Sequence, residues 1–89
     1  DVVAEESVAR DYDDKFAEYQ DAGVQEYWII DPAFQVVEQY FLDAGEYRLH
    51  IKADSGILKS RAVKGFVIPV AALFDETENL AALRLILKS

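Results

Sequence analysis

The stretch that decides the fold is GVQEYWIIDP, residues 23–32. Its apolar middle, YWII, does not alternate with polar residues, and it lies between Glu26 and Asp31. An unbroken apolar run of this length is typical of a central strand that is covered on both faces. Gly23 suits the end of a preceding helix, and Pro32 cannot donate a hydrogen bond to a sheet. The stretch therefore predicts a buried strand with two defined ends.

The segment before this strand predicts an amphipathic helix that Ser7 caps and that runs to about Ala22. Aromatic and apolar residues recur along one face at helical spacing: Tyr12, Phe16, Tyr19 and Ala22. The opposite face is acidic. The opening DVV reads as a further strand, and strand, helix and strand together form a right-handed βαβ crossover if the two strands are parallel.

An antiparallel meander is expected after Pro32. Residues 36–42 and 47–52 flank a short loop in which Gly45 can take a positive φ. Alternation places Tyr47, Leu49 and Ile51 on one face of the second strand, and Arg48, His50 and Lys52 on the other. Short strands follow at 57–59 and 66–68, then a helical turn at 70–74 and a C-terminal helix over residues 76–88. The fold class is α/β tending to α+β, with a mixed sheet.

Length and composition place the chain among small globular domains. It has 89 residues, of which 52% are hydrophobic, and it has no cysteine, which excludes disulfides and thiolate zinc sites. It lacks methionine and opens on a strand, so we expect residues 1–89 to be the C-terminal part of a larger domain. The apolar runs are too short to span a membrane and no signal peptide is evident, so a cytoplasmic protein is expected.

Charge is distributed unevenly along the chain. The net charge is −8, and residues 1–26 hold nine acids against Arg10 and Lys15, which gives −7. Residues 48–64 hold five Lys and Arg against Asp54, which gives +4. Overall acidity disfavours non-specific binding to a phosphate backbone. The pattern fits either a metal-dependent enzyme that acts on nucleic acid or a solvated acidic helix beside an exposed basic hairpin.

The segment ESVARDYDDKFAEYQDAGVQEYWIIDP resembles the core signature of the Uma-type putative restriction endonucleases, which belong to the PD-(D/E)XK nuclease superfamily. The later GILKS and GFVIPVAALF stretches resemble the same family, so the likeness covers nearly the whole chain. The matching positions in the core signature are Arg10, Asp11, Lys15, Tyr19, Gly23, Val24, Glu26, Tyr27, Trp28, Asp31 and Pro32.

The resemblance implies a restriction-endonuclease-like fold and a site that holds Mg²⁺ or Mn²⁺. In that superfamily acids from two adjacent strands hold the metal, and a lysine stabilises charge or orients the attacking water. The family's second acid aligns with Asp1, and the usual lysine position is Val3, which makes Lys15 the candidate catalytic lysine. The first metal-binding aspartate lies upstream in relatives. The family's Ser-Pro turn is replaced by Ala4-Glu5.

Three further residues are candidates for supporting roles at this site. Arg10 and Asp11 would set the start of the helix near the site, with Arg10 able to contact a phosphate. Glu26 would hold the strand end or support the surroundings of the metal. Each candidate also has a structural alternative. Lys15 would be the surface ion-pair partner of Asp11, and Arg10 and Asp11 would form an ordinary charged first turn of the helix. Glu26 would only accept hydrogen bonds that hold the strand end. His50, the only histidine, is expected in solvent.

Two functions therefore follow from the sequence. The first is a metal-dependent endonuclease that hydrolyses DNA phosphodiester bonds, of which this chain would be the C-terminal portion. The second is a non-catalytic interaction or dimerisation module derived from the same fold. DNA and a second copy of the chain are the expected partners.

Overall fold

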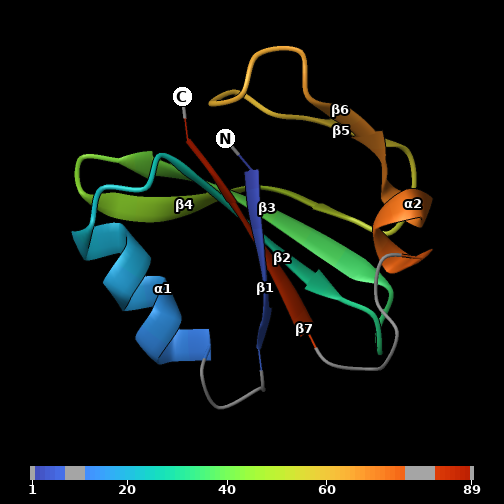
Figure 1. Cartoon of the computed structure of the whole chain (residues 1–89), viewed down its shortest axis with the longest axis horizontal. Coiled ribbons are helices and arrows are strands. Elements are labelled where there is room, and N and C mark those ends of the chain that lie inside the picture. The colour runs from blue at the N-terminus through green and yellow to red at the C-terminus, as the bar shows by residue number, and fades with distance from the viewer. Residues whose placement is uncertain (1, 8–11, 76–81, 89) are drawn as a thin grey trace.

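The computed structural model describes residues 2–7, 12–75 and 82–88 (Figure 1). Within these ranges the chain forms one sheet with the strand order β1-β7-β2-β3-β4 and a separate hairpin of β5 and β6. The elements are β1 (Val2–Ser7), α1 (Tyr12–Asp21), β2 (Glu26–Asp31), β3 (Val36–Asp43), β4 (Glu46–Ala53), β5 (Ile57–Lys59), β6 (Val67–Pro69), α2 (Val70–Asp75) and β7 (Ala82–Leu87). The α+β class and the meander predicted from the sequence are confirmed.

Strand β7 lies between β1 and β2 and is antiparallel to both. The strands β1 and β2 therefore run in the same direction, as a βαβ crossover requires, but they are not neighbours. The prediction of a mixed sheet is wrong for the described pairs, because every one of them is antiparallel.

The predicted C-terminal helix is also wrong where it can be checked, because residues 82–87 form β7. The spacing of Leu83, Ile86 and Leu87 fits a helix, but a short apolar run fits a buried strand equally well. Position in the fold decides between them: β7 makes ladder hydrogen bonds on both sides, and residues 84–87 are all buried. Residues 76–81 lie outside the described ranges.

Helix α1 ends in the way the sequence predicted. Gly23 has φ +76°, the amide of Gly23 donates to the carbonyl of Gln20, and that of Val24 donates to the carbonyl of Tyr19. These two bonds make a Schellman cap that satisfies the last carbonyls of the helix. The predicted cap at Ser7 is not observed, since Ser7 pairs with Ala82 as the last residue of β1, and α1 is described only from Tyr12.

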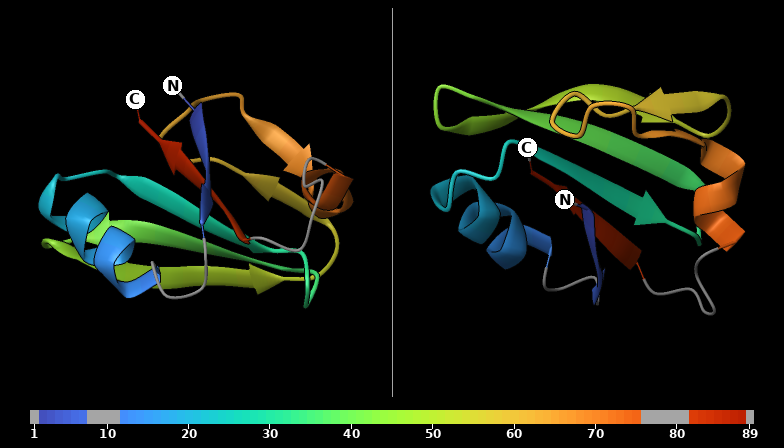
Figure 2. Two further views of the ribbon diagram at one scale, coloured as in Figure 1. Left: turned by 60° about the horizontal axis from the view of Figure 1, so that its bottom comes forward. Right: turned by 45° about the horizontal axis from the view of Figure 1, so that its top comes forward.

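The central strand β2 is buried on both faces, as its apolar run predicts. On one face Tyr27 and Ile29 pack with Phe16 of α1 and with Tyr47 of β4. The Tyr47 hydroxyl donates to the carbonyl of Val24 at 2.8 Å, and burial together with the nearby Tyr27 raises its pKa. Figure 2 shows α1 on this face, and the β5–β6 hairpin and α2 on the other.

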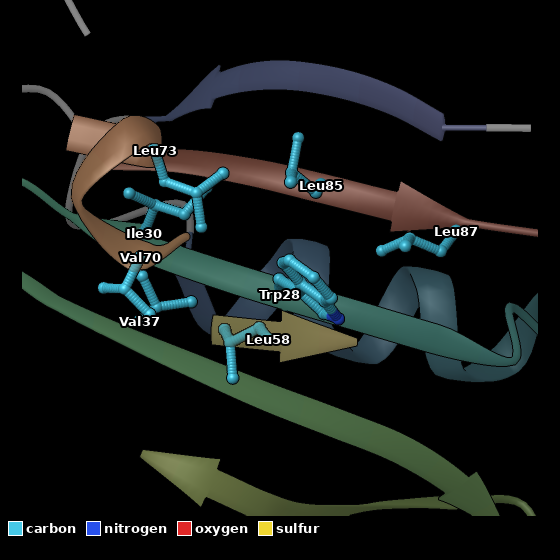
Figure 3. Close-up of a cluster of buried hydrophobic side chains, with 8 residues drawn as sticks. All are labelled: Trp28, Ile30, Val37, Leu58, Val70, Leu73, Leu85 and Leu87. Atoms are coloured by element: carbon cyan, nitrogen blue, oxygen red, sulfur yellow. The ribbon is translucent and has the colours of Figure 1, made fainter. Parts of the chain in front are cut away.

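The second face of β2 carries the larger apolar cluster (Figure 3). Trp28 and Ile30 are fully buried there, and side chains from the hairpin, α2 and β7 close over them. The buried members are Trp28, Ile30, Val37, Leu58, Val70, Leu73, Leu85 and Leu87. Two apolar faces on one strand explain why residues 27–30 show no alternation.

A β-bulge interrupts the alternation predicted for β4. Tyr40 pairs with Leu49 and Gln39 pairs with Ile51, so His50 has no opposite residue on β3. Because cross-strand partners share a face, Ile51 lies on the face of Gln39, whereas Tyr47 and Leu49 lie on the α1 face. The prediction that these three side chains share a face is therefore wrong. The bulge also places His50 on the same face as Phe41, whose ring centroid is 4.8 Å from that of His50.

The turn between β3 and β4 contains a strained residue, Ala44, which has a positive φ although it is not glycine. Asp43 pairs with Glu46, and the two residues between them have positive φ, +53° at Ala44 and +83° at Gly45. This is the pattern of a type I′ turn, in which Asn-Gly is preferred and alanine is strained. We expect Ala44→Asn to raise the free energy of unfolding in urea by about 0.5–1 kcal/mol. Ala44→Val should lower it, and equal stability of the two variants would contradict the turn assignment.

Candidate functional site

The carboxylate of Glu26, the first residue of β2, is the centre of a buried hydrogen-bond network. Its side chain has no exposed surface. Oε1 accepts hydrogen bonds from the amides of Arg61 at 2.7 Å and Ala62 at 2.8 Å, and from the Ser60 hydroxyl at 3.1 Å. One carboxylate oxygen thus fixes three consecutive residues of the loop between β5 and β6.

The other oxygen, Oε2, is held from within the sheet. It accepts from the Trp28 indole at 2.5 Å and from the Gln39 amide at 3.0 Å. The same Gln39 amide nitrogen donates to the carbonyl of Lys59 at 2.8 Å, so it connects β3 with β5. Five donors converge on one carboxylate, which offers about four lone-pair positions.

The loop that supplies three of these donors is ordered by its own hydrogen bonds. The amide of Ser60 donates to the carbonyl of Phe66 at 2.9 Å, and the amide of Val63 donates to the Ser60 hydroxyl at 2.8 Å. The Phe66 ring meets the Trp28 ring edge to face, with centroids 5.6 Å apart. The loop is therefore held both by its own hydrogen bonds and by Glu26, which acts as its anchor. This is the structural role that the sequence left open; a role near a metal stays a prediction.

Replacing the anchor should therefore cost stability. Glu26→Gln keeps the shape but sets an amide NH₂ against protein donors and leaves at least one of them unpaired. We expect it to lower the free energy of unfolding by about 2–4 kcal/mol, measured by urea denaturation.

The matched control is Glu38→Gln, because Glu38 is half-buried and accepts one described bond, from the Tyr40 hydroxyl at 3.0 Å. It should cost less than about 1 kcal/mol. Equal losses in the two variants would show that Glu26 does not anchor the loop.

Of the two predicted catalytic residues, Asp1 and Lys15, the described ranges include Lys15. Asp1, Arg10 and Asp11 lie outside the described ranges. Val2 lies opposite Leu87, and Glu26 lies opposite Leu87 on the other side of β7, so Val2 and Glu26 are at the same end of the sheet. Helix α1, with Lys15 in its first turn, starts at the Ser7 end of β1 (Figure 1). The catalytic roles of Asp1 and Lys15 stay predictions.

The described residues contain no group of three or more His, Cys, Asp or Glu side chains that could hold a metal ion. Glu26 fits poorly as a ligand, because its oxygens are already occupied by donors.

Beside the anchor lies a pair of adjoining surface hollows of about 310 and 270 Å³. Phe41, Leu42 and Arg61 line both of them, Glu26 lines the first, and His50 lines the second. The Arg61 guanidinium lies 4.0 Å from the centroid of the Phe41 ring. The sequence signalled this region only as a basic stretch over residues 48–64. The contact with Phe41 was missed because it joins β3 to a distant loop.

The fold and the sequence pattern define an α+β domain of the restriction-endonuclease-like class. The chain belongs to the Uma2 family of putative restriction endonucleases, whose family model matches residues 2–71, as the resemblance predicted. The match includes β1, α1 and β2, and β7 lies beyond it. Neither the search of curated proteins nor that of solved structures found a significant match. Among the described residues, no helix has the length and apolar character needed to cross a membrane.

Proposed function

We propose that the chain is the C-terminal half of a metal-dependent endonuclease that hydrolyses DNA phosphodiester bonds. The observation that carries the proposal is the family match over residues 2–71, which includes Arg10, Asp11, Lys15 and Glu26 and begins one residue after Asp1. It is supported by the parallel directions of β1 and β2, the arrangement that a βαβ crossover gives.

The proposal assigns the chemistry to residues outside the anchor. Asp1 and the aspartate that relatives carry upstream would hold Mg²⁺ or Mn²⁺, which would polarise the scissile phosphate and lower the pKa of the attacking water. Lys15 would stabilise the charge that develops on the phosphate, and Arg10 would contact a neighbouring phosphate. Glu26 would keep the start of β2 rigid, at the same end of the sheet as Val2.

Plasmid cleavage by the protein extended upstream through the family's first aspartate tests the proposal. We expect nicking with Mg²⁺ and none in EDTA, and a loss of about a hundredfold or more in Asp1→Asn and in Lys15→Ala. Asp21→Asn and Lys52→Ala remove exposed charges of the same signs elsewhere and should cut normally. Cleavage in EDTA, or full activity of Lys15→Ala, would contradict it.

A second candidate function, a dimerisation module, is favoured by one observation. The outer face of the β5–β6 hairpin exposes Ile57 at 64% and Val67 at 52%, next to the exposed Pro69. Exposed apolar residues grouped on one face are typical of an interaction surface.

If this surface joins two copies, light scattering should give twice the mass of one chain, and Ile57→Lys should restore the single-chain mass. Leu49→Lys, at a residue 50% exposed on the opposite face of the sheet, is the control and should leave the dimer intact. A single-chain mass for the unaltered protein at high concentration would exclude this function.

A further inference from the structure

The surface around Phe41 carries two cationic or hydrogen-donating side chains on one aromatic ring. The Arg61 guanidinium lies 4.0 Å from the ring centroid, and the His50 ring centroid lies 4.8 Å from it. Both side chains belong to exposed residues and line the hollows beside the ring. A guanidinium that stacks on an aromatic ring keeps its N–H donors directed outward and loses less freedom when it binds a ligand.

Each of the two side chains is placed by a defined feature of the fold. The backbone of Arg61 is fixed because its amide donates to the buried Glu26 carboxylate at 2.7 Å. His50 is the unmatched residue of the β4 bulge, and bulges commonly re-aim a side chain beside a functional site.

We infer that this surface binds the phosphodiester backbone of a nucleic acid, with Arg61 and His50 donating to successive phosphates. The inference rests on the proposed function in taking DNA as the natural ligand, and it adds a binding surface that the candidate catalytic residues do not form.

Charge complementarity supports this occupant in spite of the net charge of −8. The acidic helix α1 packs on the opposite face of the sheet, so its exposed Glu18 and Asp21 lie away from Phe41. On the Phe41 side, Asp43 pairs with Arg48 at 3.1 Å, and Glu26 is already satisfied by five donors. Glu46, opposite Asp43, is exposed on the same side, so the support is local: the Arg61 charge lies directly on the Phe41 ring and makes no ion pair among the described residues.

Fluorescence anisotropy with labelled DNA tests the inference, using the 89-residue chain in EDTA at low salt. The probes are a thymidine oligonucleotide of roughly 20 nucleotides and a duplex of the same length, each longer than one binding site. We expect Arg61→Gln to weaken binding of at least one probe roughly tenfold and to reduce the salt slope by about one phosphate contact. His50→Gln should weaken it less, and Arg61→Lys should fall in between because it keeps the charge without the planar stack.

Lys52→Gln is the matched control, since Lys52 is exposed and pairs in register with Glu38 on the α1 face. It removes a charge of the same sign from the opposite face of the sheet and should change binding less than about twofold. Circular dichroism of each variant verifies that the fold is kept. No binding by the unaltered chain, equal losses in Lys52→Gln and Arg61→Gln, or unchanged binding by Arg61→Gln would each overturn the inference.

The two proposals can fail separately. Binding in EDTA needs neither the metal nor cleavage, so Arg61-dependent binding by a protein that never cuts DNA would overturn only the proposed function. Mg²⁺-dependent cleavage with no effect of Arg61→Gln on binding would overturn only the surface assigned here.

Discussion

A carboxylate without exposed surface is stable in a protein interior only when hydrogen-bond donors replace the water it has lost. Glu26 collects these donors from β2 itself, from the neighbouring strand β3 and from the loop after β5, whose donors lie 34 to 36 residues away in sequence. The hairpin, the loop and the sheet are thereby joined at one point. The position of Arg61 depends on the same point, because its amide is one of the five donors. A structural anchor and a surface for ligand binding are in this way coupled through one side chain.

The sequence predicted what local physics controls. The Schellman cap at Gly23 needs only a residue that tolerates positive φ, and the burial of Tyr27 to Ile30 follows from an apolar run between two stop signals. The sequence-based prediction was wrong where partners that are distant in the chain determine the secondary structure. Residues 82–87 satisfy helical spacing as well as a strand pattern, and only the space between β1 and β2 selects the strand.

The candidate site shows the same division. The sequence singled out Glu26 and the basic stretch over residues 48–64, because charge beside an apolar strand and clustered cations are visible in one dimension. It could not join Arg61 and His50 to Phe41, since one contact crosses from loop to sheet and the other depends on a bulge. A bulge shifts the alternation of side chains between the two faces by one residue, and the residue pattern of β4 does not predict it.

The place of β7 has a consequence for how the chain folds. Strand β7 is the last described strand in the sequence, yet it lies between β1 and β2 in the sheet. It is also the only neighbour of β1 in the described sheet. During synthesis β2, β3 and β4 can pair as successive hairpins as soon as each strand is made. Strand β1 can pair only with β7, which follows it by about 80 residues. Pairing over such a distance loses the conformational entropy of a long loop before the strand contacts form, which slows folding. Until β7 is made, the edges of β1 and β2 that will pair with it have no strand partner, so the nascent chain can pair wrongly with other strands until its sheet is completed.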